Sequence, residues 1–137
     1  MAIAERSLAS RYNRPGCGIV NHYTYAMVSG EDMEEGVTGE VASLAGVLRL
    51  GRLIYLYADS RVQIEGSTDR VFGDNVARRF EAYGWQVVRP VDGNRVDQVE
   101  QAIREAQADT ERPSLIICQT IIGYGRPTDA TNWQSSE

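Results

Sequence analysis

Lysine is absent from this chain of 137 residues, so all 14 basic residues are arginines. This absence excludes catalysis through a lysine nucleophile or a Schiff base. Histidine occurs once, at His22, which we expect to be a structural polar residue, so acid–base chemistry by imidazole has no obvious carrier. The two cysteines, Cys17 and Cys118, form no Cys-x-x-Cys motif, and we expect free thiols in a reducing cytoplasm.

Long apolar runs are also missing. No segment reaches the roughly 18 apolar residues that cross a membrane, and the charged first residues do not resemble a signal peptide. The net charge of −5 argues against nucleic acid or an anionic membrane as a partner. The length and the hydrophobic content of 42% are typical of one globular domain, which we expect over residues 1–126, followed by a polar tail over residues 127–137.

Apolar periodicity and turn residues predict alternating strands and helices. The predicted strands cover residues 19–29, 53–57, 85–91 and 114–122. The predicted helices cover residues 2–12, 33–50, 74–83 and 96–108. Asp74 is the predicted cap of the third helix. This alternation predicts a single α/β domain with a mostly parallel sheet flanked by helices.

An acidic turn joins the first predicted strand to the second helix. Four of the six residues from 31 to 36 are carboxylates, at Glu31, Asp32, Glu34 and Glu35. A junction of this kind is a common ligand site, because the first helical N–H groups are unpaired and the helix dipole favours negative charge there. Asp32 is the predicted N-cap, with Glu35 completing a capping box, so these carboxylates either hold a metal ion or only cap the helix.

The helix that follows the turn carries one apolar stripe at helical spacing. The residues of this stripe are Val37, Val41, Leu44, Ala45 and Leu48. We expect this stripe to face the core. Glycines in the same helix, including Gly46, would let it lie close to another backbone, and Gly51 is the predicted C-cap.

Several segments together resemble one known family. They read HYTYAMVS, DMEEGVTGEVASLAG, LGRLIYLYADSRVQIEG, RRFEAYGWQVVRPVDG and RPSLIICQTIIGYGRP. In this order they are similar to transketolase, in the part that binds the diphosphate end of thiamine diphosphate. The resemblance covers essentially the whole chain but only a portion of a transketolase, without the pyrimidine-binding and C-terminal domains. It implies thiamine diphosphate and Mg²⁺ as family cofactors.

The resemblance also implies where a metal–diphosphate site should lie. The family has Gly-Asp-Gly at a strand end, an Asn about thirty residues later, and a ligating backbone carbonyl two residues beyond, which suits a hard divalent cation. In this chain Gly30 stands in place of the Asp, Glu31 in place of a Gly, and Ser60 in place of the Asn. Only the backbone carbonyl of Val62 could be kept, so the resemblance implies that Gly30, Glu31, Asp32 and Ser60 are vestigial cofactor positions.

Two further features count against an intact site. Trp133 and Ser136 fall at or near family histidines that contact the diphosphate and the substrate, so we assign no catalytic residue. The carboxylates of the acidic turn would repel a diphosphate. Two unit charges ~4 Å apart cost on the order of 4 kcal/mol at an effective dielectric near 20, which offsets the ~0.3–2 kcal/mol gained at a helix N-terminus.

Three interpretations remain open from the residues. The first is a degenerate transketolase-like domain that is inactive alone and binds no cofactor. The second is one part of a split transketolase, a transferase of two-carbon ketol units, completed by another chain; Glu31, Asp32 and the Val62 carbonyl would then hold the metal. The third is a non-enzymatic interaction module. It would use the helix over residues 39–46 and nearby tyrosines such as Tyr57 to form a homo-oligomer or bind a complementary chain.

Overall fold

The computed structural model describes residues 1–60, 62–63, 66–67 and 73–125. The helices are α1 (Ala2–Tyr12), α2 (Gly30–Glu34), α3 (Gly36–Val47), α4 (Val76–Ala82) and α5 (Val96–Ala108). The strands are β1 (Thr24–Val28), β2 (Leu53–Asp59), β3 (Val62–Gln63), β4 (Gly66–Ser67), β5 (Gln86–Asp92) and β6 (Ser114–Gln119). The predicted tail over residues 127–137 lies outside the described residues.

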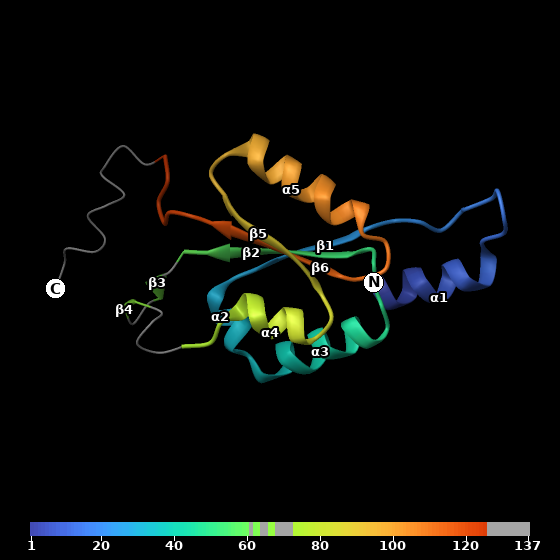
Figure 1. The fold of residues 1–137 in the computed structure, drawn as a ribbon, viewed down its shortest axis with the longest axis horizontal. Helices are drawn as coiled ribbons and strands as arrows, with labels where there is room; N and C mark the ends of the chain where they lie inside the picture. The colour runs from blue at the N-terminus through green and yellow to red at the C-terminus, as the bar shows by residue number, and fades with distance from the viewer. Residues whose placement is uncertain (61, 64–65, 68–72, 126–137) are drawn as a thin grey trace.

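Four strands form one sheet in the order β1-β2-β6-β5, and every neighbouring pair is parallel. Helices α2, α3 and α4 cover one face of this sheet, α5 covers the other, and α1 lies beyond its end (Figure 1). The short strands β3 and β4 form a separate antiparallel pair. The predicted α/β domain with a parallel sheet and flanking helices is therefore confirmed.

The larger core lies between the sheet and helices α3 and α4. Trp85 is almost fully buried there, and its indole Nε1 donates a hydrogen bond to the carbonyl of Ala42 in α3 at 2.8 Å. The ring of Phe80 from α4 meets it edge-on, with the ring centroids 5.0 Å apart. One aromatic cluster thus joins the sheet to both helices.

The smaller core lies on the α5 side of the sheet. Ala102 and Ala106 of α5 are buried against Ile116 of β6, as the periodicity of that helix predicts. Cys118 is also buried in this cluster, and its burial raises the pKa of the thiol. A neutral, enclosed thiol is a poor nucleophile, so Cys118 is a packing residue.

Two predicted strands are too long. Residues 19–23 precede β1 rather than belonging to it, because the only strand that pairs with β1 within the described residues is β2, which begins at Leu53. At the other end of the chain β6 stops at Gln119. Thr120 still donates to the Asp59 carbonyl at 3.0 Å, but the backbone then turns, with Tyr124 N–H donating to Ile121.

The helix predicted over residues 33–50 is divided into α2 and α3. Glu35 separates them with an extended backbone, at φ −62° and ψ 124°. The predicted stripe of α3 does not face the core: of its members only Ala45 is buried, and Ala42 is the other buried residue of the helix. The reason is steric, because a Cβ added at Gly46 would lie 1.8 Å from the Tyr83 carbonyl oxygen. Only a face of small side chains permits this approach.

Two predicted caps are also wrong. The left-handed residue after α3 is Arg49, with φ 50°, and not Gly51. Gly51 instead allows a close contact, since a Cβ there would lie 1.9 Å from the Thr110 carbonyl oxygen. Helix α4 is capped by Asn75, whose side chain accepts from the Arg78 N–H at 3.0 Å, one residue after the predicted Asp74.

Candidate functional site

The candidate site lies at the carboxyl ends of β1 and β2. These strands are adjacent and parallel, and Val28 pairs in register with Tyr57, so Gly30 and Ser60 follow strand ends at the same edge. Ligands of open α/β sheets bind outside this edge. The structure therefore places Gly30 and Ser60 at the same edge of the sheet, as their positions after two predicted strands suggest.

Ser29, and not Asp32, is the N-cap of α2. The Ser29 N–H donates to Asp32 Oδ2 at 2.7 Å, and the Ser29 hydroxyl donates to the same oxygen at 2.9 Å. The Ser29 hydroxyl also accepts from the Asp32 N–H at 3.3 Å. These bonds complete a capping box three residues earlier than the predicted one. The hydrogen bond from the Ser29 N–H, and then that from the Ser29 hydroxyl, lowers the pKa of Asp32 below the ordinary value of an aspartate.

Replacing Ser29 by alanine is expected to destabilise the protein by about 1 kcal/mol, because the cap loses its side-chain oxygen.

Asp32→Asn is expected to weaken the capping box of Ser29 and Asp32 in a pH-dependent way. Since folding lowers the pKa of Asp32, its contribution is full above the unfolded pKa and is lost as pH falls through the folded pKa. Urea unfolding of wild type and Asp32→Asn at pH 7 and in acid checks this. The difference between their free energies of unfolding must be smaller in acid.

If the free energies of unfolding of wild type and Asp32→Asn differ by the same amount at all pH values, the Asp32 charge does not stabilise α2. Glu31→Gln is the matched control, because Glu31 is an exposed neighbour and makes no such capping bond within the described residues.

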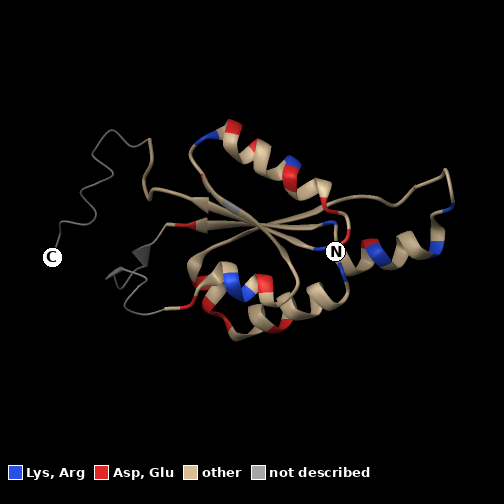
Figure 2. Ribbon diagram, viewed as in Figure 1, with Lys and Arg blue, Asp and Glu red and all other residues tan. Residues whose placement is uncertain are grey.

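An arginine from α4 lies within the acidic surroundings of α2. Arg79 donates from Nη2 to the Met33 carbonyl at 2.8 Å and pairs with Asp74 at 3.4 Å. Figure 2 shows acidic residues at α2, at the end of β2 and before α4, with basic residues of α4 beside them. Nothing in the spacing of the sequence relates position 79 to position 33, so sequence analysis missed this contact.

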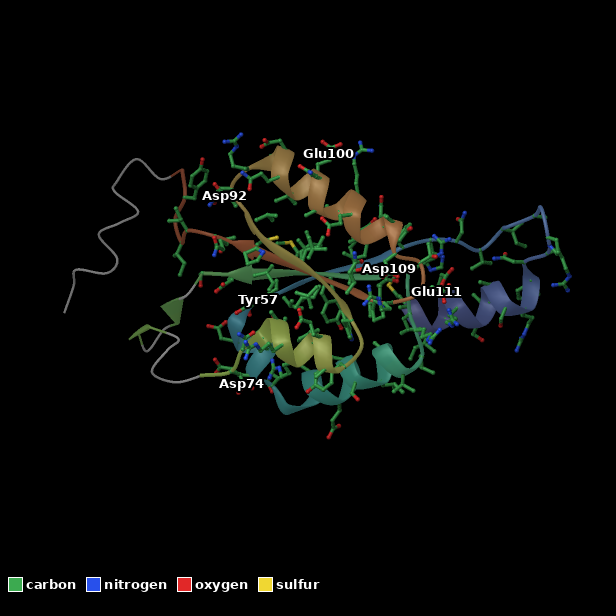
Figure 3. The ribbon with its side chains drawn as sticks, in the orientation of Figure 1. Tyr57, Asp74, Asp92, Glu100, Asp109 and Glu111 are labelled. Atoms are coloured by element: carbon green, nitrogen blue, oxygen red, sulfur yellow. The ribbon has the colours of Figure 1, made fainter. Side chains whose placement is uncertain are left out.

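The pKa of Tyr57 responds to the charges of this region. It is buried between the sheet and α4 (Figure 3), so its predicted role as a partner-contacting tyrosine is wrong. Burial raises its pKa most, the carboxylates of Asp59 and Glu34 raise it further, and Arg79 lowers it. The candidate edge is therefore acidic, and Arg79 offsets only part of that charge.

The remaining candidate ligands lie on different elements of the fold. Glu31 is exposed, Ser60 follows β2, and Val62 lies in β3, paired with Ser67 of β4. Within the described part of the chain, no three His, Cys, Asp or Glu side chains are placed to hold a metal ion. The predicted positions of Trp133 and Ser136 lie outside the described residues.

A family model described as "Transketolase, thiamine diphosphate binding domain" matches residues 1–136. This chain belongs to the transketolase family. It is 51% identical over 130 residues to transketolase 1 of Escherichia coli, and 52% identical over 130 residues to the transketolase of Geobacillus stearothermophilus. Each match covers 95% of this chain but 20% of the relative, so the chain spans about a fifth of the length of these transketolases.

Solved transketolase structures share the fold. A transketolase mutant from Pichia stipitis superposes with a TM-score of 0.87 at 38% identity, covering 92% of this chain and 19% of that one. The transketolase of Leishmania mexicana gives a TM-score of 0.86, again at 38% identity over 92% of this chain. The transketolase coenzyme-binding fold is thus present. Within the described residues, no helix is long and apolar enough to cross a membrane.

Proposed function

We propose that this chain keeps the coenzyme-binding fold of transketolase but, alone, neither holds thiamine diphosphate and Mg²⁺ nor transfers ketol units. One observation carries the proposal. Gly30 and Ser60 follow the ends of two neighbouring parallel strands, where the family resemblance implies a metal-binding Asp and Asn; Gly30 has no side-chain oxygen and Ser60 has only a hydroxyl.

The neighbouring carboxylates do not replace the missing ligands. Asp32 Oδ2 already accepts two hydrogen bonds from Ser29, and turning this carboxylate toward a metal would break the cap of α2. Glu31 is exposed to water. A hard cation that bridges to a diphosphate needs several fixed oxygens, and the residues of this edge do not fit that requirement.

Calorimetric titration of the chain with thiamine diphosphate and Mg²⁺ is expected to show no binding at micromolar concentrations. Restoring the family pattern with Gly30→Asp, Glu31→Gly and Ser60→Asn is expected to raise affinity by about tenfold or more, or ~1.4 kcal/mol, because two metal ligands return. Gly18→Asp with Ser7→Asn is the matched control, since both positions are exposed and lie away from the edge. Micromolar binding by the unaltered chain would refute the proposal.

The alternative function is that of a split transketolase subunit completed by a second chain. Glu31 favours it, because this exposed carboxylate lies one residue after the matched Asp position and reaches further. In that case the chain, mixed with a polypeptide that supplies the rest of a transketolase, would bind the coenzyme with Mg²⁺ and transfer ketol units between sugar phosphates. Glu31→Gln would abolish both effects.

We also propose that the chain associates with another polypeptide, either a second copy or a complementary transketolase-like chain. Strand β1 supports this, because it forms one edge of the sheet and hydrogen-bonds to β2 alone among the described strands. Met27 on β1 is 83% exposed, and Tyr25 is exposed beside it. An apolar sheet edge of this kind is a template for contact with another chain.

A further inference from the structure

A cavity of about 410 Å³ lies between α1 and the segment Leu50–Arg52, which precedes β2. This places the cavity at the amino end of the parallel sheet, whereas the candidate edge is at the carboxyl end. Figure 1 shows α1 beyond the end of the sheet that is opposite to β3 and β4. The volume falls within the ~300–1,000 Å³ of pockets that hold small molecules. The cavity is therefore a second place where this fold can take a ligand.

Glu5 of α1 lines this cavity and is only 6% exposed. Within the described residues the one partner of its side chain is Arg52, whose Nε lies 3.5 Å from Glu5 Oε1, too far for a strong hydrogen bond. Arg52 is held where it is, because Nη1 donates to the Asn21 carbonyl at 2.8 Å and the guanidinium lies 5.0 Å from the centre of the Tyr23 ring. A buried carboxylate is costly unless it is hydrogen-bonded. Glu5 therefore keeps acceptor capacity for a donor in the cavity.

Two arginines that line the cavity supply the opposite charge, Arg52 and Arg6. Arg6 donates from Nη1 to the Arg49 carbonyl at 3.1 Å, which leaves the other N–H groups of its guanidinium for a ligand. A guanidinium binds a carboxylate through two parallel hydrogen bonds. The lining thus offers an acceptor for an ammonium group and donors for a carboxylate.

We propose that this cavity binds a free α-amino acid with an apolar side chain, its ammonium group at Glu5 and its carboxylate at Arg6. Asn13 does not compete for these groups, because its side chain donates to the Val20 carbonyl at 2.8 Å and accepts from the Val20 N–H at 2.9 Å. The ligand's apolar side chain would lie against the apolar part of the lining, which consists of Ala2, Ala9, Val20 and Leu50.

Titration of the isotope-labelled full chain with L-leucine, followed by NMR, tests the proposal. We expect saturable shifts of the amide signals of residues 2–13 and 50–52, with a dissociation constant on the order of 1 mM or lower. Thiamine diphosphate is left out, so the result does not depend on the coenzyme proposal above. The absence of saturable shifts up to about 20 mM L-leucine overturns the amino-acid site.

Two analogues test the two charges separately. Isoamylamine is leucine without the carboxylate, and isocaproate is leucine without the ammonium group. Each is expected to bind at least about tenfold more weakly than L-leucine, because each leaves one charged part of the lining unpaired. If either analogue binds as tightly as L-leucine, the proposed recognition of both charges is wrong.

Replacing Glu5 by glutamine is expected to weaken L-leucine binding by at least about tenfold, because the amide lacks the charge that attracts the ammonium group. Glu111→Gln is the matched control, since Glu111 is exposed, lies outside the lining and should leave the affinity unchanged. Arg6→Gln is expected to weaken L-leucine but not isoamylamine, which has no carboxylate.

Replacing Ala9 by phenylalanine fills the cavity without touching the pair of Glu5 and Arg52, so it tests the site even if Glu5→Gln does not fold. Ala9→Phe is expected to abolish L-leucine binding while circular dichroism shows a folded chain. Wild-type affinity in Ala9→Phe, or in folded Glu5→Gln, overturns the proposal.

Discussion

Replacing Trp85 by alanine is expected to destabilise the protein by about 3–5 kcal/mol. The indole is 2% exposed, so its removal leaves a cavity between the sheet and helices α3 and α4. Its ring centroid lies 4.9 Å from that of Tyr55 and 5.0 Å from that of Phe80, and both contacts are lost. The hydrogen bond from Nε1 to the Ala42 carbonyl, which ties α3 to the sheet, is lost as well.

A loss of this size is a large part of the ~5–15 kcal/mol by which domains are stable, so the variant should be partly unfolded at room temperature. Urea unfolding followed by circular dichroism measures the effect. Trp85→Phe keeps most of the apolar volume and is expected to cost less than half as much. Val96→Ala, at an exposed site, should change stability by under about 0.5 kcal/mol. A Trp85→Ala variant as stable as Val96→Ala would show that this cluster does not hold the two helices.

Replacing Gly46 by alanine is expected to destabilise the protein by about 2 kcal/mol or more, although alanine is the better helix former by ~1 kcal/mol. The added Cβ would lie 1.8 Å from the Tyr83 carbonyl oxygen and 3.0 Å from the Tyr83 carbonyl carbon. Because both atoms belong to the backbone at the end of α4, no side-chain rotation relieves the clash. Helix α3 must move outward, away from Trp85.

Gly36→Ala is the matched control for this prediction. Gly36 lies in the same helix, and a Cβ there meets nothing within 4 Å. It should leave stability unchanged or raise it by up to ~1 kcal/mol, through helix propensity alone. Thermal unfolding of the two variants side by side separates the effects. Equal midpoints would mean that α3 and α4 are not held at the close approach seen here.

The element order and the parallel sheet were predictable because they depend on local patterns. Short apolar runs such as residues 53–57 and 114–119 are typical of strands buried on both faces, and the helix between Val96 and Ala108 repeats its buried alanines at helical spacing. The candidate edge followed from the same order, because Gly30 and Ser60 each come within two residues of the end of a parallel strand.

The amino-acid sequence by itself determined the fold class and the family, because each is a property of residue identity and spacing. That Gly30 and Ser60 stand in place of metal ligands is a prediction from the same spacing. Only the tertiary structure decided which side of α3 is buried, which partner Asp32 takes and where Arg79 binds. The physical reason is that spacing shows which side chains share a face, whereas burial depends on the room that a neighbour leaves. Here the Tyr83 backbone leaves no room for a Cβ at Gly46, so glycine and alanine form the buried side of α3 and its larger apolar side chains face outward.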